Sequence, residues 1–461
     1  MRALARGSLV VLVAAALSVA PSTPGFQPPA SGQVEQPNVL VVITDDQPVG
    51  TLDVMPKTRR WFKSGGVDFT NAFATTPLCC PSRGSIFSGR YAHNHGITTN
   101  SNPGSLDQDA TVQRYLQDAG FLTGIAGKFL NGWDREIDPP HFDRWSIFEP
   151  SGYFDTIFNV DGELRDVPGY STDFVAREAV GLLEDFEGED ASPWLLFVTP
   201  FAGHGPYTPA TRHETVGIQV PELGSAAFEG DRSDKALFLQ QRNATIRSAE
   251  AQRRLQLRTL LAADEMVDDV MTALQDLGEL QDTLAFFMSD NGFMWRDHGF
   301  VGKRLPYLPS IRIPFLVRWP GHLSGGSSDD RVIANIDIAP TILEAAGVSP
   351  SLKYPFDGWS LLATHSRSRL LLEYFRDPGA PNFPTWASIF EIGLQYIEYY
   401  RDDVRTFAEY YDLEWDPSQL VNLLGDADTA NDPLPTELSS LESDLQDLRG
   451  CAGTTGQSAC P

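Results

Sequence analysis

The chain has 461 residues, of which 42% are hydrophobic, and it carries 35 lysines and arginines against 61 aspartates and glutamates. The resulting net charge of -26 argues against nucleic acid or an anionic membrane surface as a partner. Because the chain is longer than a usual single core, we expect two domains, or one large domain with an appendage.

The first residues have the layout of an export signal. They contain Arg2 and Arg6, an apolar run and then small, turn-forming residues. We assign residues 1–30 to a signal peptide and leader, and we expect a secreted or otherwise extracytoplasmic protein. An uncleaved membrane anchor is the alternative, but the apolar run of about a dozen residues is short for a bilayer. No later stretch is long and apolar enough to span one.

Short apolar runs alternate with segments of helical periodicity through the first three quarters of the chain. Continuous apolar runs predict strands buried on both faces at residues 38–43, 121–126, 194–199, 284–289 and 314–319. Helical spacing predicts helices within residues 109–120, 171–186 and 259–278. This alternation predicts an α/β fold in which helices sandwich a large mixed, mostly parallel sheet.

After about residue 350 the pattern changes to aromatic-rich segments, at residues 369–375, 392–403 and 405–417. Such segments favour a small antiparallel sheet over another βαβ unit. We therefore expect a main domain at residues 36–350, a smaller antiparallel α+β subdomain at 351–430 and a tail at 431–461.

Four cysteines in an exported chain can pair in three ways. Cys451 and Cys460 lie close together in the Gly/Thr/Ser-rich tail, so they would close a short disulfide loop in an oxidising compartment. Cys79 and Cys80 remain, and adjacent cysteines rarely bond each other because the resulting ring is strained.

Acidic and amide side chains follow two of the predicted strands. Asp45 and Asp46 come after the first, and Asp290 and Asn291 come after the fourth. Ligands gather at the carboxyl ends of strands in an open α/β sheet, and oxygen-bearing side chains suit a hard cation such as Ca²⁺ or Mg²⁺. Each pair alone could equally cap a turn. Together the two pairs favour a metal site.

The segment CCPSRGSIFSGR predicts the start of a helix, with Pro81 near the first helical position and Arg83 in the first turn. Free backbone N–H groups and the helix dipole at such an end suit a tetrahedral anion, and Arg83 would add a fixed cation. A nucleophile at Cys79 or Cys80, beside a metal, would then have the parts needed to attack a phosphoryl or sulfuryl centre.

At this segment the sequence resembles a known family. Cys79 to Arg83, followed by Gly89, matches the C-x-P-S-R-x-x-x-x-x-G signature of the type I sulfatases, members of the alkaline phosphatase-like superfamily. Further segments resemble other elements of the family, namely PNVLVVITDDQ, SDNG, HGFVGKRLPYLPSIRIPFLVRWPG and YYDLEWDPSQLVNLL. The resemblance spans residues 37–425. Within the family, LCCPSRGSIFSGRYAHNH and AGKFLN are most similar to the N-acetylglucosamine-6-sulfatases.

The resemblance implies a maturation step and a metal. Cys79 would be oxidised to Cα-formylglycine by a formylglycine-generating enzyme, while Cys80 would pack. The hydrated aldehyde, a gem-diol, would attack sulfur and form a covalent sulfo-enzyme intermediate. The cation, usually Ca²⁺ in such enzymes with Mg²⁺ as the alternative, would be held by Asp45, Asp46, Asp290 and Asn291.

The same resemblance implies roles for further residues. Arg83 would stabilise the modified residue. The positions matching the family's sulfate-binding and proton-transfer residues are Lys128, His204 and Lys303. The candidates for binding the rest of the substrate, each with a scaffold role as the alternative, are His298, Asn131 and His95.

The sequence departs from the common family pattern in two places. Leu130 stands where many sulfatases have histidine, a form shared by the glucosamine-6-sulfatases, and Tyr307 begins YLP in place of a common YEE. The leading hypothesis is an exported sulfatase acting on a sulfated sugar such as N-acetylglucosamine 6-sulfate. The alternatives are a phosphate or phosphonate ester hydrolase of the same superfamily and a glycan-binding relative that has lost catalysis.

Overall fold

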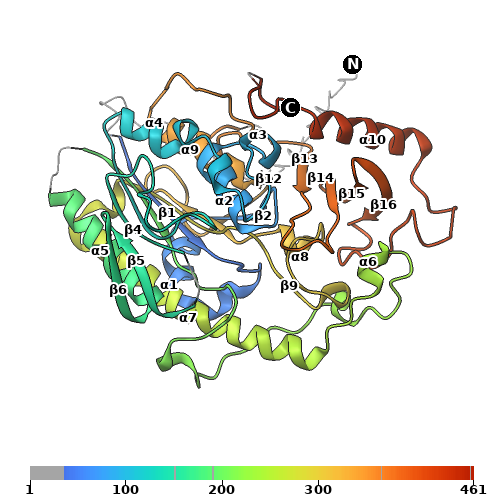
Figure 1. The fold of residues 1–461 in the computed structure, drawn as a ribbon, viewed down its shortest axis with the longest axis horizontal. Coiled ribbons are helices and arrows are strands. Elements are labelled where there is room, and N and C mark those ends of the chain that lie inside the picture. The colour runs from blue at the N-terminus through green and yellow to red at the C-terminus, as the bar shows by residue number, and fades with distance from the viewer. Residues whose placement is uncertain (1–35, 150–151, 189–191, 365, 457, 461) are drawn as a thin grey trace, which may run out of the picture.

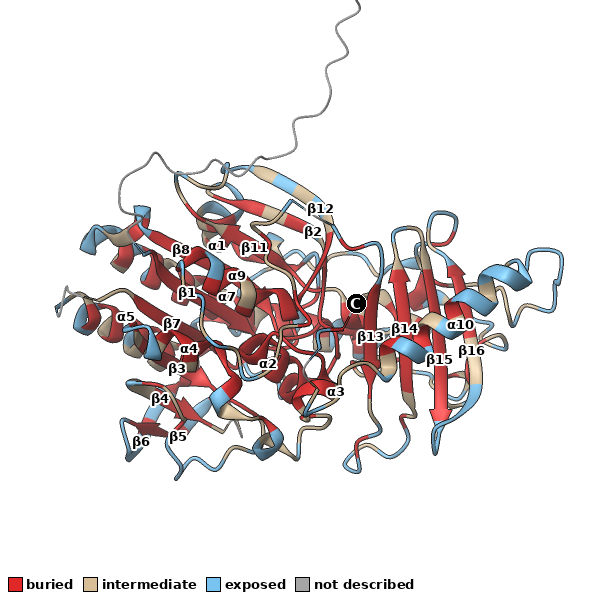
Figure 2. Cartoon of the chain, turned by 90° about the horizontal axis from the view of Figure 1, so that it is seen from above, coloured by how far each residue is buried: buried red, intermediate tan, exposed pale blue. Residues whose placement is uncertain are grey.

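The computed structural model describes residues 36–149, 152–188, 192–364, 366–456 and 458–460, so the predicted signal and leader lie outside the described residues. Seen from above, a large part built of a sheet and helices stands beside a smaller sheet that carries one long helix (Figure 2). No helix of the described ranges is both long and apolar enough to cross a membrane.

The large sheet has ten strands in the order β12-β2-β11-β8-β1-β7-β3-β4-β5-β6. Their bounds are β1 (Asn38–Thr44), β2 (Val67–Phe73), β3 (Leu122–Lys128), β4 (Arg144–Phe148), β5 (Phe154–Val160), β6 (Glu163–Tyr170), β7 (Trp194–Thr199), β8 (Thr283–Ser289), β11 (Phe315–Arg318) and β12 (Ser327–Ala334). The five central strands β8, β1, β7, β3 and β4 run parallel. The predicted mixed, mostly parallel sheet is therefore confirmed.

One predicted strand runs against its neighbours. β11 is antiparallel to both β8 and β2, and Phe315 at its start pairs with Met288 at the end of β8. The chain therefore leaves the sheet at the carboxyl end of β8 and enters it again at the same edge, where β11 begins. It forms only short elements there, β9 (Met294–Trp295), β10 (Val301–Gly302) and α8 (Leu308–Ile311).

Helices cover both faces of this sheet (Figures 1 and 2). Alternate residues of β1 face opposite sides, as expected for a strand. Val39 and Val41 pack with α2 (Cys79–Ser88), α4 (Val112–Asp118) and α9 (Ile338–Ala345), whereas Leu40 and Val42 pack with α5 (Ser171–Gly188) and α7 (Ile246–Leu277). The remaining short helices are α1 (Pro56–Thr58), α3 (Ala92–His95) and α6 (Leu237–Gln240).

The longest helix begins earlier than its periodicity predicts. The expected helix at residues 259–278 is the second half of α7, which starts after Thr245, whose hydroxyl accepts a hydrogen bond from the Ser248 N–H. Gly278, at φ 94°, ends the helix. Residues 246–258 are mostly polar, so hydrophobic spacing alone gives no signal for that half.

The smaller sheet has four antiparallel strands, β13 (Leu370–Tyr374), β14 (Thr385–Glu391), β15 (Leu394–Arg401) and β16 (Val404–Asp412). Helix α10 (Pro435–Arg449) packs Leu441, Leu445 and Leu448 into the same buried cluster as this sheet. The expected small antiparallel sheet is confirmed, while the exact domain bounds stay a prediction.

A buried carboxylate joins the smaller sheet to the larger part. Glu409 of β16 accepts hydrogen bonds from the hydroxyls of Tyr307, Tyr399 and Tyr411. Burial raises the pKa of Glu409 to about 7, against the opposing effects of Lys235 and of these hydrogen bonds. The junction therefore contains an acid that ionises near neutral pH.

This raised pKa predicts a pH-dependent stability. Below about pH 4.5 Glu409 is protonated in both folded and unfolded chains, so its stabilising contribution is complete. Between about 4.5 and about 7 the unfolded chain ionises first, and the free energy of unfolding falls as pH rises. We expect Glu409→Gln to remove this part of the slope in urea unfolding measured from pH 4.5 to 8. The exposed Glu414→Gln should leave the slope unchanged, and identical slopes for Glu409→Gln and wild type would contradict the assignment.

The C-terminal segment is attached to the large part of the molecule. Cys451 and Cys460 form a disulfide. The Cys460 N–H donates to Asp357, and the Gly453 carbonyl accepts from the guanidinium of Arg90, just before α3. Gly453 and Cys460 also bond to Asn94, so these residues of the tail pack beside α3.

Candidate active site

The two acidic pairs predicted from the sequence meet at the carboxyl edge of the large sheet. β1 and β8 are adjacent and parallel, so Asp45 and Asp46 lie beside Asp290 and Asn291. The Asp46 N–H donates to Asp290 Oδ1 over 3.2 Å, and the Asn291 amide donates to Asp46 Oδ1 over 2.6 Å. All four side chains are buried.

Special backbone conformations allow this crowding. Asp46 has φ 55°, in the left-handed region that an aspartate tolerates better than most residues. Gly203, at φ 101°, lies so close to β1 that a Cβ atom there would stand 2.0 Å from the carbonyl oxygen of Asp45. A side chain at position 203 would push the segment after β7 away from the end of β1.

Helix α2 brings Cys79 to the acidic pairs. Leu78 precedes the helix in an extended conformation, Cys79 is its first residue, and Gly89 at φ 66° ends it. Cys79 Sγ lies 3.4 Å from Asp45 Oδ1 and 3.9 Å from Asp46 Oδ1, and it is fully buried. The predicted reactive residue is therefore in contact with two of the four predicted metal ligands.

Three cations face the three carboxylates. Lys128, the last residue of β3, places Nζ 2.5 Å from Asp45 Oδ2, and Arg83 Nε lies 3.0 Å from Asp290 Oδ2. Lys303 Nζ contacts Asp46 Oδ1 and lies 2.6 Å from Cys79 Sγ. With equal numbers of fixed positive and negative side chains, the described cluster is close to neutral before any further ion binds.

These pairs shift the pKa values of the buried groups. Burial alone would raise the pKa of Asp45, but Lys128, His204 and Arg83 outweigh it and hold that pKa far below its usual range. For Lys128, burial favours the neutral amine, yet Asp45 outweighs burial and raises the pKa. Asp45 and Lys128 therefore stay ionised.

The two adjacent cysteines occupy different environments. Burial, reinforced by Asp45, raises the pKa of the Cys79 thiol, and burial raises that of Cys80 to about 12. Both cysteines are free thiols. Cys80 Sγ donates to the carbonyl of Asn131 over 3.5 Å and belongs to the core cluster beneath α2. The structure thus separates a residue of the polar cluster from a packing residue.

His204 stands at the rim of the cluster. It follows β7, its Nε2 lies 3.7 Å from Asp46 Oδ2, and 30% of its side chain is exposed. Its Nδ1 lies 2.7 Å from the Gly205 carbonyl, which fixes the ring. His204 is therefore in contact both with the buried cluster and with solvent.

The other predicted residues lie around or behind this cluster. Burial lowers the pKa of His95 to about 3, and its Nε2 pairs with the Ser85 hydroxyl, so it supports α2 as a neutral ring. His298 Nδ1 pairs with Glu229 over 2.9 Å, and its ring packs on Tyr307. Among the residues that the structure describes, neither histidine forms a hydrogen bond to the cluster. Their substrate-binding roles stay predictions.

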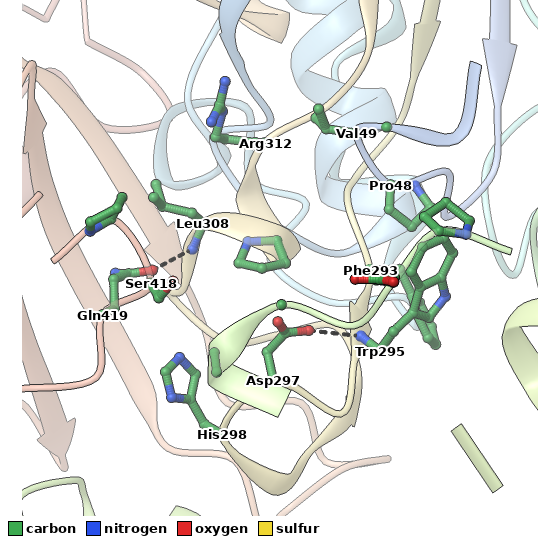
Figure 3. Close-up of a pocket in the computed structure, with 17 residues that line it drawn as sticks. Pro48, Val49, Phe293, Trp295, Asp297, His298, Leu308, Arg312, Ser418 and Gln419 are labelled. Carbon is green, nitrogen blue, oxygen red and sulfur yellow. Dashed lines mark hydrogen bonds between the residues drawn. The ribbon is translucent and has the colours of Figure 1, made fainter. Parts of the chain in front are cut away.

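His298 lines a separate cavity of about 330 Å³ (Figure 3). Its walls come from the loops after β1, β7 and β8 and from the segment after β16, and they include Pro48, Val49, Pro221, Phe293, Trp295, Asp297, Ser418 and Gln419. Trp295 donates to the side chain of Gln256, which in turn donates to the Asp46 carbonyl. A chain of two hydrogen bonds thus links a wall residue of the cavity, Trp295, to the backbone of Asp46 in the cluster.

The cluster has the composition of a metal site. Asp45, Asp46, Cys79 and His204 each offer a ligand atom, and these atoms lie within 4.8 Å of one another. Asp290 and Asn291 add further oxygen atoms next to them. Carboxylate and amide oxygens are the ligands of hard divalent cations, so this acidic cluster could bind one.

Sequence reasoning missed two residues at the cluster. Tyr207 follows His204, and burial followed by the charge of Asp46 raises its pKa. Glu149 follows β4, and Lys128 is among the charges that act on it. Recognising β4 as a strand would have indicated Glu149, because its position after a strand end is the signal that identified Asp45.

Comparison with known proteins establishes the family. The sulfatase family model matches residues 37–348, and the model of the C-terminal region of N-sulphoglucosamine sulphohydrolase matches residues 296–447. The chain belongs to the sulfatase family. The sulfatase match covers Lys128 at the end of β3 as well as Asp45, His204 and Asp290, which follow β1, β7 and β8, so all four lie in the matched region.

The alignments with known sulfatases extend over most of this chain. It is 29% identical to human N-acetylglucosamine-6-sulfatase over 482 residues, covering 91% of this chain and 86% of that one. It is 33% identical to a putative extracellular sulfatase Sulf-1 homolog of Caenorhabditis elegans, but it spans only about half (49%) of that relative's length. The structure of BT4656 in complex with its substrate D-glucosamine-2-N,6-O-disulfate superposes with a TM-score of 0.78 at 23% identity, covering 90% of this chain and 97% of that one. This likeness shows the fold.

Proposed function

We propose that this sulfatase hydrolyses sulfate esters of a sugar, such as N-acetylglucosamine 6-sulfate. The observation that carries the proposal is the contact of Cys79 with Lys303 and Asp45. Cys79 lies within the range that the sulfatase family model matches, in a segment that resembles the family's C-x-P-S-R signature. The similarity to human N-acetylglucosamine-6-sulfatase over 91% of the chain supports the choice of sugar.

The cluster fits a hard divalent cation, which we propose to be Ca²⁺, with Mg²⁺ as the alternative. The residues that would hold it are Asp45, Asp46, Asp290 and Asn291. When bound, such a cation polarises a sulfate oxygen and the attacking hydroxyl. The near balance of fixed charges in the described cluster means that the bound cation would make the site positive, which favours an anionic ester in a chain of net charge -26.

Cys79 is the position we propose to be converted to formylglycine by a formylglycine-generating enzyme of the producing cell. The environment fits a hydroxyl-bearing group, because Lys303 can donate to it and Asp45 and Asp46 can accept from it. When present, the hydrated aldehyde supplies an oxygen nucleophile for the sulfur atom.

The remaining residues have separable tasks in this proposal. Lys128 and Lys303 bind the sulfate oxygens and offset the charge that develops on them. Arg83 holds Asp290 through Nε and the Lys128 carbonyl through Nη1, so it orients both sides of the cluster. His204, at the solvent-facing rim, delivers a proton to the leaving sugar oxygen.

We also propose that the protein acts outside the cytoplasm. The disulfide between Cys451 and Cys460 is typical of an oxidising compartment. The signal-like sequence at residues 1–30 and the similarity to a putative extracellular sulfatase support the same location.

Release of free sulfate tests the proposed function. The protein would be produced together with a formylglycine-generating enzyme, loaded with Ca²⁺ and given N-acetylglucosamine 6-sulfate, 4-nitrophenyl sulfate, a phosphate monoester, a phosphodiester and a phosphonate monoester. We expect kcat/KM for the sulfate esters to exceed that for the phosphorus esters by at least about 100-fold. A wide preference for a phosphodiester or phosphonate would show that the protein is a phosphorus ester hydrolase, and no turnover at all would favour a glycan-binding protein.

A further inference from the structure

The carboxyl edge of the sheet continues past the cluster to β4. β4 is parallel to β3, and Lys128 pairs with Phe148 in their register. Glu149, the next residue, therefore lies beside Phe129 at the edge where Lys128 meets Asp45. Neighbouring strands stand about 4.8 Å apart, which places Glu149 one strand beyond the proposed sulfate-binding lysine.

Only one of the two carboxylate oxygens of Glu149 has a hydrogen-bond partner among the described residues. Its Oε1 accepts a hydrogen bond from the Gly132 N–H over 3.2 Å. Its Oε2 is buried and has no hydrogen-bond partner among the described residues. Burial raises the pKa of Glu149, whereas the Gly132 N–H, Lys128 and Arg83 lower it, so the carboxylate lies within electrostatic reach of the cluster. A buried acceptor without a donor is costly, and such groups call for a specific explanation.

A second buried acceptor without a partner in the described ranges belongs to the residue just before Gly132. Asn131 precedes the Gly132 that binds Glu149, and its Oδ1 is also buried without a partner in the described structure. The backbone carbonyl of the same residue accepts from Cys80, immediately after Cys79 in α2. The segment of Asn131 and Gly132 is thus bonded to Glu149 through the Gly132 N–H, and to the start of α2 through the Asn131 carbonyl.

We propose that Glu149 and Asn131 form an acceptor subsite that binds hydroxyl or N–H donors of the sulfated sugar, an inference that rests on the proposed sulfatase function. The cations of the cluster take the sulfate, and the ring carries donors that need acceptors nearby. A carboxylate and an amide oxygen recognise these donors, whereas Glu149 repels a second sulfate or a carboxylate on this side of the ring. The subsite therefore selects a sugar whose neighbouring substituents are uncharged or cationic.

Comparing two substrates of one enzyme isolates this role. We expect Glu149→Gln to lower kcat/KM for N-acetylglucosamine 6-sulfate by about 10- to 100-fold, as expected for losing a hydrogen bond to a charged group. We expect kcat/KM for 4-nitrophenyl sulfate, whose aryl group has no such donors, to change less than about twofold. The matched control is Glu184→Gln, which makes the same change at an exposed position of α5.

Binding without turnover provides a second measurement. In Ca²⁺-loaded Cys79→Ser protein, isothermal titration with N-acetylglucosamine 6-sulfate should give a Kd raised about 10-fold or more by Glu149→Gln, and unchanged by Glu184→Gln. Equal losses on both substrates, no loss on either, or wild-type turnover of the aryl sulfate alone would overturn the subsite. None of these results would overturn sulfate ester hydrolysis, which fails only when the wild-type protein cleaves neither sulfate ester.

Discussion

Replacing Cys79 by alanine is expected to lower kcat for sulfate esters by at least about 10⁴-fold. The side chain is buried against Asp45, Asp46 and Lys303, and no other nucleophilic side chain in the described cluster occupies this position. Removing it leaves the cations to bind sulfate without a group to attack it. Steady-state sulfate release from N-acetylglucosamine 6-sulfate and 4-nitrophenyl sulfate measures the loss.

Cys80→Ala is the matched control for this prediction. Cys80 belongs to the core cluster and bonds to the Asn131 carbonyl, so its replacement should cost about 1–2 kcal/mol of stability while kcat stays within a few-fold. Mass spectrometry of the wild-type tryptic peptide should show a loss of about 18 Da relative to the thiol, as conversion to formylglycine requires. Turnover by Cys79→Ala at the wild-type rate would exclude Cys79 as the reactive residue.

Replacing Asp45 by asparagine is expected to remove the bound metal and to lower kcat/KM by at least about 10³-fold. The substitution takes one negative charge from a cluster in which Lys128 and Arg83 are buried, and it removes an anionic ligand of the proposed cation. We expect less than about 0.1 Ca²⁺ per chain by elemental analysis, where the wild type should hold about one.

The same variant should be less stable even without metal. Removing one partner of a buried ion pair leaves an uncompensated charge and typically costs about 3–5 kcal/mol, so urea unfolding in EDTA should show a large loss. Asp53→Asn makes the same chemical change at a side chain that is 77% exposed and paired with Arg59, and it should alter neither metal content nor stability. Full metal content in Asp45→Asn would contradict the assigned ligand set.

Four of the five central strands could be predicted because burial on both faces leaves a simple signature. β1, β3, β7 and β8 are continuous apolar runs, and each coincides with a predicted strand to within two residues at either end. Among the flanking strands, β11 shares this signature, whereas the strands nearer the two edges of the sheet lack it because one face or one end meets solvent. β6 and the first half of β12 are largely polar, so their pairing depends on neighbours that the sequence does not reveal.

The candidate site was predictable wherever its residues follow such strands. Asp45 and Asp290 could be brought together from sequence alone because parallel strand ends share an edge. Glu149 escaped notice because β4 is a five-residue strand with a polar start. The partner of His298 was equally hidden, since Glu229 lies in a loop far along the chain.

The complete burial of Cys79 constrains when the proposed modification could take place. In the folded chain its side chain is 0% exposed, between the strand ends and the first turn of α2. An enzyme that oxidises this cysteine must reach it before β8 has paired with β1 and brought in Asp290, more than 200 positions later in the chain. The proposed conversion to formylglycine would therefore compete with folding in time, and a producing cell that folds the chain faster than it modifies it would accumulate correctly folded, inert protein.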